Sequence, residues 1–530
     1  MRRETLIVSM LMSATLLFVS CKDAQKEAEK TAPREVTSVI EDQGYRPNFH
    51  FTPNQNWMND PNGMFYLDGT YHLFYQHYPN GNTWGPMHWG HATSKDMVKW
   101  EHQPIALYPD QHGYIFSGSA VVDKNNTSGL GAAGQVPIVA LYTYHNAEGE
   151  KQGRNDFQTQ GLAYSLDSGK TWVKYKGNPV IKNPGIRDFR DPKVTWDAER
   201  SQWVMTLSTY EKSLFYTSKN LIDWTFSSEF GEGIGAHGGV WECPDLLKMK
   251  VEGTSEEKWV LIQSLNPGAY NGGSGTQYFV GDFDGKTFHP ESYVETLGEK
   301  HDFWIDFGKD NYAGVTWNNA PDGRTLFIGW MSNWEYANVV PTETWRSTST
   351  IARELKLLEN NGVYRIVSTP VQELSKYVNK NINKGAVEAT NGTTLLSVDD
   401  LSLSSTVINF EIANLKNIDY KFLLTNAIGD SLVFGYDHPK KQFYIDRSKS
   451  GRVDFSEQFA SKPSVAPRIS TANHLEVSII LDKTSIELFF DDGTTVMSEI
   501  FFPKNLFQEF NSITNQPFQI QNLKANQLKL

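Results

Sequence analysis

Cysteine is nearly absent from this chain, because its 530 residues include only two, Cys21 and Cys243. Two cysteines cannot build the disulfide framework that holds many small secreted domains together. If Cys21 carries a modification, as the N-terminal pattern indicates, no disulfide is possible at all. We therefore expect the fold to depend on a hydrophobic core, which a chain of this length is large enough to bury.

An excess of basic residues is also missing. The 49 Lys and Arg are outnumbered by 61 Asp and Glu, which gives a formal net charge of −12. Nucleic-acid binding requires a basic face, so this charge argues against a nucleic-acid partner, whereas a neutral polymer such as a polysaccharide is compatible with it. Aromatic residues are abundant at 13%. They suit stacking on sugar rings, and they equally suit packing within β-sheets.

Long apolar runs are missing except at the N-terminus. There, residues 6–19 follow Arg2 and Arg3 and lead to Cys21. The run is short for a membrane span and has the form of a secretory signal. It looks like a bacterial lipoprotein signal, in which the cysteine is acylated and becomes the mature N-terminus, although Phe18 stands where leucine is usual.

The N-terminal pattern predicts where the protein is located. We expect a signal peptide over residues 1–21 that ends at the acylated Cys21, the lipid anchor. Residues 22–43 are rich in Lys, Glu and Ala and are expected to form a flexible tether. The protein would be exported and held at the bacterial cell envelope, on the periplasmic or the surface face of the outer membrane, touching the membrane only through this lipid. The alternative is an ordinary cleaved signal and a periplasmic or secreted protein.

Convincing amphipathic helices are missing between residues 44 and 365. This region consists of short β-prone runs separated by Asp-Gly, Asn-Gly and Ser-Gly turns. A loose repeat leads from a polar turn to a Trp or Phe. Its four copies lie at 94–100, 165–172, 218–224 and 282–288. Units of this size are typical of four-stranded propeller blades. We predict a five-bladed β-propeller over 44–365, with the repeated aromatic residues serving blade packing.

The sequence pattern changes after the predicted propeller. Residues 366–377 have the composition of a connector. From 378 to 530, strict alternation of apolar and polar residues between turn signals predicts a β-sandwich. We expect this domain to be a rigid support packed on the first domain. Carbohydrate binding by the sandwich is the alternative.

Three carboxylates stand in unusual local sequences, each in a different predicted blade. Asp60 is flanked by turn-forming residues in Trp-Met-Asn-Asp-Pro-Asn-Gly. Asp191 lies in Phe-Arg-Asp-Pro-Lys, and Glu242 lies in Trp-Glu-Cys-Pro-Asp. Each begins a strand-like run. The innermost strands of a propeller start around its central axis, so the three side chains can converge there. Hydrolysis of a glycosidic bond requires two carboxylates, one to attack or to activate water and one to protonate the leaving oxygen.

Each of these residues also has an ordinary structural interpretation when it is taken alone. Asp60 could cap a surface turn, Asp191 could pair with the adjacent Arg190, and Glu242 could be a strand-edge residue. Their joint occurrence in three blades favours a catalytic site.

The sequence resembles glycoside hydrolase family 32, the invertases, inulinases and levanases that hydrolyse β-fructofuranosides. Three signature blocks occur in the family order at 57–63, 190–192 and 241–245. The resemblance extends through further blocks at 116–119, 306–313, 329–334 and 443–448. It covers roughly residues 45–520. It implies an all-β fold in which a five-bladed propeller is followed by a β-sandwich, in agreement with the segmentation above.

The resemblance implies roles for the three acids. Asp60 would be the nucleophile that attacks C2 of a fructosyl unit. Glu242 would be the general acid and then the general base. Asp191 would bind fructose hydroxyls and stabilise the transition state, with Arg190 beside it. The outcome would be retention of configuration through a covalent fructosyl-enzyme.

The resemblance also implies a pocket for the terminal fructose. Its members would be Asn59, Gln76, Trp84, Phe116, Ser117, Arg190 and Trp330. The polar side chains would bind hydroxyl groups, and the aromatic ones would form walls that exclude water and stack on the ring. Core packing is the alternative for each aromatic residue taken alone.

No metal and no cofactor are expected, because this chemistry needs neither. The histidines near the motifs have no recognisable metal-ligand spacing; they are His72, His77, His88, His91 and His237. Asp306 and Asp310 are expected to be rim or support residues.

The predicted function is hydrolysis of β-fructofuranosidic bonds in fructans such as levan or inulin, with sucrose as a further candidate substrate. We expect exo-acting release of fructose by a monomer. An endo-acting levanase or inulinase and a fructosyltransferase with the same three acids are alternatives. A propeller glycosidase of another family would not be expected to contain block 57–63. A non-catalytic carbohydrate-binding propeller would keep the aromatic residues but lose a carboxylate.

Overall fold

β-Strands provide nearly all the regular structure of this computed structural model, which describes residues 44–530. The predicted signal peptide, the Cys21 anchor and the tether lie outside the described residues. None of the helices among residues 44–530 has the length and hydropathy of a membrane span. The helical segments are α1 (Ala147–Lys151), η1 (Val294–Thr296), η2 (Pro321–Gly323), η3 (Ala337–Val339) and η4 (Gln372–Tyr377).

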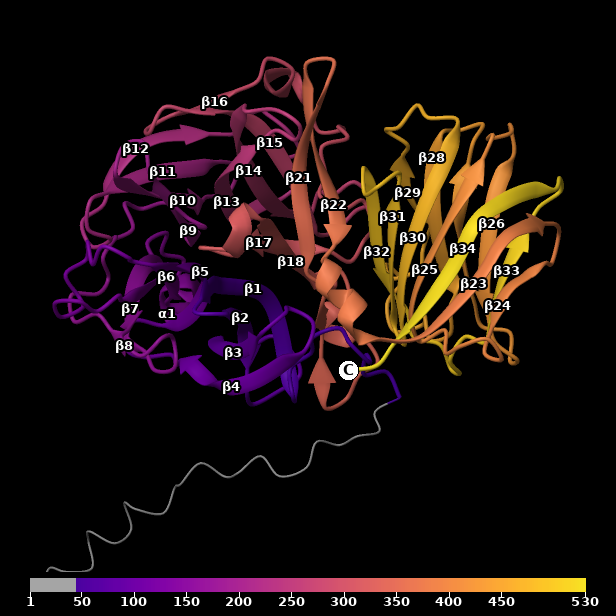
Figure 1. The fold of residues 1–530 in the computed structure, drawn as a ribbon. Coiled ribbons are helices and arrows are strands. Elements are labelled where there is room, and N and C mark those ends of the chain that lie inside the picture. The colour runs from indigo at the N-terminus through magenta and orange to yellow at the C-terminus, as the bar shows by residue number, and fades with distance from the viewer. Residues whose placement is uncertain (1–43) are drawn as a thin grey trace, which may run out of the picture. The chain divides into compact units, whose positions relative to one another are not determined.

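Five antiparallel sheets form the blades of a propeller (Figure 1). Blade one contains β1 (Asn56–Leu67), β2 (Thr70–Tyr78), β3 (His88–Ser94) and β4 (Trp100–Leu107). Blade two contains β5 (Tyr114–Val122), β6 (Ile138–His145), β7 (Gln158–Ser165) and β8 (Val173–Lys174). Blade three contains β9 (Arg190–Asp197), β10 (Gln202–Ser208), β11 (Ser213–Ser218) and β12 (Thr225–Phe230).

The remaining two blades complete the ring. Blade four contains β13 (Val240–Lys250), β14 (Glu257–Asn266), β15 (Gly275–Phe283) and β16 (Phe288–Pro290). Blade five contains β17 (Tyr312–Thr316), β18 (Thr325–Met331), β20 (Thr348–Ser349), β21 (Arg353–Asn360) and β22 (Val363–Pro370). The short β19 (Trp345–Arg346) pairs in parallel with β1, so a late segment of the propeller chain closes the ring on the first blade.

The predicted repeat is the turn that precedes the fourth strand of each of the first four blades. In blade one, the Ser94 hydroxyl accepts from the Met97 amide, and Asp96 accepts from the Lys99 amide. Blade three repeats the pattern, since the Ser218 hydroxyl accepts from Leu221 N–H. Such side-chain caps fix the turn through local hydrogen bonds. The aromatic residue that follows packs against a neighbouring blade, as Trp172 does on Phe74 and Phe288 does on Phe230, so the predicted packing role is confirmed.

Two six-stranded sheets follow the propeller and form the predicted β-sandwich. The first contains, in spatial order, β23 (Val378–Ala389), β34 (Phe518–Leu528), β25 (Ser405–Ala413), β30 (His474–Asp482), β31 (Ser485–Phe490) and β32 (Thr495–Ile500). The second contains β24 (Thr394–Ser397), β33 (Glu509–Ile513), β26 (Asp419–Thr425), β27 (Ser431–Asp437), β28 (Gln442–Lys449) and β29 (Ser464–Pro467). The predicted fold class, a five-bladed propeller followed by a β-sandwich, is thus confirmed.

The start of the predicted connector belongs to the propeller. Residues 366–370, which were predicted to belong to the connector, continue β22 and pair with β21. The alternation of apolar and polar residues from Val367 to Thr369 is too short to be recognised as a strand unless its partner strand, β21, is known. Only residues 371–377 connect the last blade to β23.

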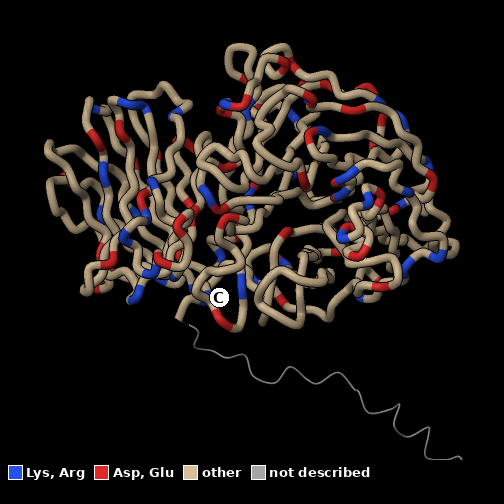
Figure 2. Tube along the Cα trace, turned by 180° about the vertical axis from the view of Figure 1, so that it is seen from behind, with Lys and Arg blue, Asp and Glu red and all other residues tan. Residues whose placement is uncertain are grey.

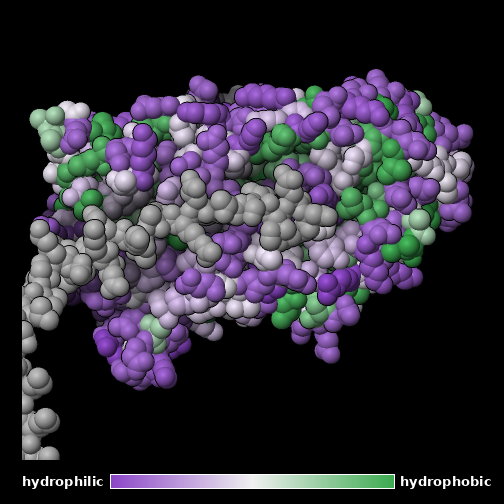
Figure 3. All heavy atoms as spheres, turned by 90° about the horizontal axis from the view of Figure 1, so that it is seen from below, coloured by the Kyte–Doolittle hydropathy of each residue, from purple (hydrophilic) through white to green (hydrophobic). Residues whose placement is uncertain are grey.

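Charged residues of both signs are interspersed over the described chain (Figure 2). The face drawn in Figure 3 is mostly hydrophilic, with hydrophobic residues in separate groups between the polar ones. Large apolar side chains that are exposed include Trp84, Tyr210 and Tyr270.

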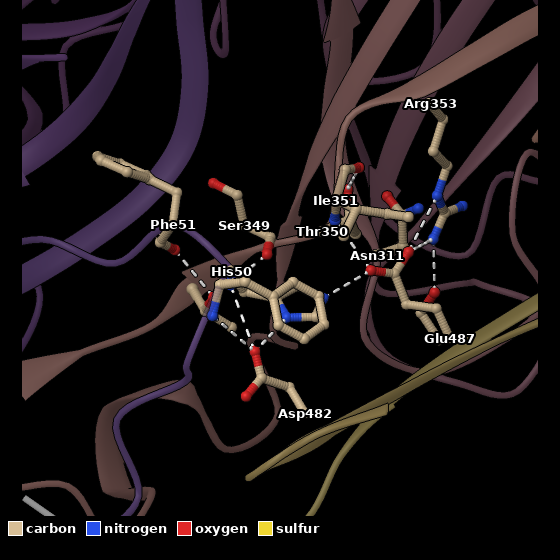
Figure 4. A network of polar contacts seen from close by, with 12 residues as sticks. His50, Phe51, Asn311, Ser349, Thr350, Ile351, Arg353, Asp482 and Glu487 are labelled. Carbon is tan, nitrogen blue, oxygen red and sulfur yellow. Dashed lines mark hydrogen bonds and ion pairs between the residues drawn. The ribbon is translucent and has the colours of Figure 1, made fainter. Parts of the chain in front are cut away.

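A buried network of charges joins the propeller to the sandwich (Figure 4). The two ring nitrogens of His50 contact Asp482 and Glu487, at 2.8 and 2.9 Å. Arg353 of β21 reaches Glu487 and, at 2.9 Å, Asp306. All these side chains are essentially inaccessible to solvent. Buried charges are tolerated only when they are paired and hydrogen-bonded, so this network fixes how the two sheet systems meet.

Candidate active site

One extra residue interrupts the innermost strand of every blade near its N-terminal end. The register skips a position between Met58 and Pro61 in β1 and between Glu242 and Asp245 in β13. Strands β5, β9 and β17 contain the same irregularity. A β-bulge bends its strand and re-aims side chains. Residues in or next to the bulges of β1, β5, β9 and β13 line a common pocket, whereas β17 contributes none.

Asp60 lies in the bulge of β1 and lines this pocket. Its carboxylate accepts hydrogen bonds from the Ser117 hydroxyl at 2.8 Å and from the Asn59 amide at 3.0 Å. Burial raises the pKa of Asp60 to about 6, and the charge of Glu242 acts in the same direction. Because two neighbours hold the carboxylate in place, Asp60 is oriented as a nucleophile requires.

Asp191 lies in the bulge at the start of β9, where its φ is 64°. Such a positive φ is unfavourable for an aspartate and is held here by neighbouring groups. The Asp191 amide donates to the Thr143 hydroxyl at 2.9 Å, and its carboxylate accepts from the Cys243 amide at 3.0 Å. Burial raises the pKa of Asp191 to about 7; Arg190 opposes this effect, whereas the charges of Glu242 and Asp60 add to it.

Glu242 projects from β13 into the same pocket. One carboxylate oxygen accepts from Arg190 at 2.7 Å, and the other accepts from the Tyr312 hydroxyl. Burial holds the pKa of Tyr312 well above its usual range, so its phenol stays protonated and remains a donor. Arg190 is in turn held by Asp188 at 2.7 Å. Glu242 is thus fixed from two sides while about a fifth of its side chain stays accessible.

The pocket wall contains six of the seven residues predicted to bind sugar. They are Asn59, Gln76, Trp84, Phe116, Ser117 and Arg190. The Gln76 side-chain nitrogen is buried, and none of the described residues hydrogen-bonds to it. It is therefore a donor available to a ligand hydroxyl. Phe116 stacks on His145 with centroids 4.2 Å apart and meets Trp84 edge-on at 6.0 Å.

Trp330, the seventh predicted residue, does not line the pocket. It is fully buried in β18 and packs behind Tyr312 and Trp334. Trp334 supplies the wall instead. Both tryptophans lie in block 329–334. The choice between them depends on where β18 ends: it ends at Met331, and the chain then turns Trp334 to the surface of the pocket.

Two further residues of the site, Tyr312 and Cys243, had no predicted role. Tyr312 lies within block 306–313 and bonds to Glu242. Cys243 has its sulfur 3.5 Å from Asp60 and 3.6 Å from Asp191. Burial raises the pKa of the Cys243 thiol well above its usual value, so it stays protonated. Their positions in the sequence could have indicated both residues. Cys243 directly follows the predicted acid Glu242, and Tyr312 lies in a family block, 306–313.

Other candidate residues lie away from the pocket. Asp306 and Asp310 are buried supports that bind Arg353 and Arg447, rather than rim residues. Among residues 44–530, no group of three or more His, Cys, Asp or Glu could hold a metal ion. The motif histidines instead make local contacts, such as the one at 2.7 Å between His77 and the Trp57 carbonyl.

Three carboxylates, an arginine and a half-open aromatic pocket define a glycosidase-type site. The family model for the glycosyl hydrolases family 32 N-terminal domain matches residues 50–370, and the model for the family 32 C-terminal domain matches residues 371–527. The chain therefore belongs to glycosyl hydrolases family 32 and is a glycosidase.

Similar proteins extend over most of the chain. A levanase of Bacillus subtilis is 47% identical over 472 residues, which are 87% of this chain and 67% of that protein. An extracellular exo-inulinase of Aspergillus niger is 41% identical over 495 residues, which are 88% of this chain and 90% of that protein.

Solved structures show the same fold. The exo-inulinase of Aspergillus awamori superposes with a TM-score of 0.83 at 37% identity, covering 92% of this chain and 99% of that one. The β-fructofuranosidase of Schwanniomyces occidentalis, complexed with fructosyl-erythritol, gives 0.81 at 35% identity, covering 92% and 98%.

Proposed function

We propose that this chain hydrolyses β-fructofuranosidic bonds in fructans and releases fructose from the chain end. The observation that carries the proposal is the convergence of Asp60, Asp191 and Glu242 in one pocket of a family 32 chain. The names of its relatives, levanase and exo-inulinase, support fructans as the substrate class.

In the first step, an Asp60 oxygen attacks C2 of the terminal fructosyl unit. The bond from C2 to the leaving oxygen breaks, and Glu242 gives its proton to that oxygen. Asp191 binds fructose hydroxyls and stabilises the positive charge that develops at the ring. The contacts of Glu242 with Arg190 and Tyr312 aim its carboxyl group. The product of this step is a covalent fructosyl-enzyme.

In the second step, Glu242 takes a proton from a water molecule as that water attacks C2. The bond from C2 to Asp60 breaks, and fructose leaves with retained configuration. Glu242 is then protonated again and Asp60 is again a carboxylate, so one water is consumed for each bond cleaved.

The size of the pocket favours exo action. The cavity has a volume of only about 60 Å³, which is well below the usual range of pockets for drug-sized ligands. Walls from Trp84, Phe116 and Trp334 surround it, with Arg190 and Gln76 among its polar residues. A cavity this small leaves room for no more than one sugar ring, whereas cleavage of an internal bond would require an open groove on both sides.

Product analysis on levan, inulin and sucrose is the test of this function. We expect fructose as the sole early product from both polymers, detected by chromatography of samples taken at low conversion. A ladder of oligosaccharides would show endo action, and longer products built on added sucrose would show a transferase. Absence of any product from all three substrates would contradict the proposed function.

We further propose that the protein is exported and anchored by a lipid on Cys21. The extracellular relative and the N-terminal sequence pattern support export. Replacing Cys21 by Ala is expected to move the protein from the membrane fraction to the soluble exported fraction, because a single cysteine would carry the acyl chains. Immunoblots of fractionated cells, with Cys243→Ala as the matched cysteine control, measure this. Unchanged membrane association of the Cys21 variant would contradict the lipid anchor.

A further inference from the structure

Trp334 connects the wall of the pocket to the predicted nucleophile. Its ring stacks on Trp57, with centroids 5.8 Å apart. The Trp57 indole N–H donates to the Asn59 side-chain oxygen at 2.7 Å, and the Asn59 amide donates to Asp60. A displacement of Trp334 would therefore affect the hydrogen bonds of Asp60 through the Trp57 ring and the Asn59 side-chain amide.

Two loops hold Trp334, and we call them the pocket loops: residues 267–274 between β14 and β15, and residues 332–336 after β18. The Trp334 amide donates to the Ser274 hydroxyl at 3.0 Å, and the Ser274 amide donates to the Asn333 side chain at 3.3 Å. The contact is close enough that a Cβ at Gly273 would collide with the Asn333 amide group. The pocket loops therefore form one unit.

The sandwich forms hydrogen bonds to the first pocket loop at Asn271. The Asn271 side chain donates to the Val465 carbonyl at 2.8 Å and accepts from the Val465 amide at 3.0 Å. Val465 belongs to β29, at the edge of its sheet. Asn271 is buried, and it thus extends the exposed edge of the sandwich by one pair of hydrogen bonds.

The sandwich forms hydrogen bonds to the second pocket loop at Tyr336. Arg447 of β28 donates to the Tyr336 hydroxyl at 2.8 Å and to Asp310 at 2.6 Å, and the same hydroxyl donates to Asp310 at 2.6 Å. These three side chains are almost fully buried. In addition, Lys309 bridges Glu335 at 2.7 Å and the Gln458 carbonyl of the sandwich at 2.9 Å. Charged hydrogen bonds in a buried site are strong and directional, so they define the position of the loop.

We propose that the sandwich is a positioning element of the sugar pocket, with Arg447, Tyr336 and Asn271 as positioning residues that hold Trp334 against the bound fructose. This inference rests on the proposed function, because it concerns the same pocket. It goes beyond a supporting role, since a mere support would stabilise the fold without affecting substrate affinity. No residue of the sandwich lines the pocket itself, so its effect must pass through the pocket loops.

The experiment measures KM and kcat separately for Tyr336→Phe and Asn271→Ala, with inulin-type trisaccharide as the substrate. Tyr336→Phe removes only the hydroxyl that bonds Tyr336 to Arg447 and Asp310. We expect KM to rise about three- to ten-fold in each variant, as the loss of one or two hydrogen bonds implies, and kcat to change less than KM. Calorimetric titration of the same trisaccharide into each variant combined with Glu242→Gln should show an equal loss of affinity.

Tyr444→Phe is the matched control. The Tyr444 hydroxyl also donates to a carboxylate, Asp419 at 2.8 Å, but both lie within the sandwich, away from the pocket loops. We expect its KM and affinity to equal those of the wild type. Wild-type KM and affinity in folded Tyr336→Phe and Asn271→Ala would overturn the inference, and so would an equal rise of KM in Tyr444→Phe. If one variant fails to fold, the other decides. An inactive wild type would instead contradict the proposed function, which separates the two failures.

Discussion

Replacing Asp60 by Asn is expected to lower kcat/KM for fructans by about 10⁴-fold or more, because the reaction then lacks its proposed nucleophile. The amide has nearly the same shape as the carboxylate and can still accept the hydrogen bond from Ser117. The variant should therefore fold and bind substrate. Release of fructose at saturating substrate, together with thermal unfolding, measures both properties.

Two further variants locate the effect at the nucleophile. Asp96→Asn makes the same chemical change in blade one, at a residue that caps the turn before β4, and should keep wild-type kcat. Glu242→Gln should lose fructan hydrolysis but keep the nucleophile. With an activated fructoside whose leaving group needs no protonation, the fructosyl-enzyme should still form, and added azide should accelerate turnover by attacking C2, breaking the bond to Asp60 and yielding fructosyl azide. Asp60→Asn should show no such acceleration. Turnover of Asp60→Asn near the wild-type rate would remove the proposed mechanism.

The proposed role of Asp60 as nucleophile also predicts the acidic limb of the pH profile. Burial raises the pKa of Asp60 to about 6, and only the ionised carboxylate attacks C2. In the free enzyme, kcat/KM should therefore fall as pH decreases through about 6. The raised pKa of Asp191, about 7, makes this limb steeper, because the free enzyme then requires two ionised acids.

Local patterns made the fold predictable. The turns before the fourth strands repeat a short set of capping residues, and these act through hydrogen bonds between near neighbours such as Ser94 and Met97. The alternation in β26 likewise reports which side chains are buried, without knowledge of the partner strand. The C-terminal end of β22 was missed because its last residues are recognisable as a strand only from their pairing with β21.

The site was predictable only in part. Asp60, Asp191 and Glu242 stand out because each is surrounded by residues that break regular strand geometry. The bulges that bring them together could not be predicted, because a bulge is defined by register against the neighbouring strand. Trp334 and Tyr312 were missed as residues of the site because their partners, Trp57 and Glu242, are distant in the sequence. Their roles depend on how blades one, four and five meet.

Replacing His50 by Gln is expected to lower the free energy of unfolding by about 3 kcal/mol near pH 6. Burial alone would lower the pKa of His50, but hydrogen bonds to Asp482 and Glu487 raise it to about 9. His50 is therefore a cation in the folded protein and joins the N-terminal segment to two acids of the sandwich (Figure 4). Gln cannot supply that charge, so Asp482 and Glu487 would lose a buried positive partner.

The pH dependence distinguishes a lost charge from lost packing. A raised histidine pKa stabilises the folded state fully below the unfolded pKa, about 6.5, and this contribution disappears as pH rises through about 9. Denaturant unfolding of the wild type should thus show falling stability from pH 6.5 to 10, while His50→Gln follows a flatter curve that meets the wild type near pH 10. His474→Gln, at a histidine that is about half exposed, should leave the wild-type curve unchanged. A constant difference between His50→Gln and the wild type at every pH would mean that His50 acts through its shape alone and that its charge does not join the two domains.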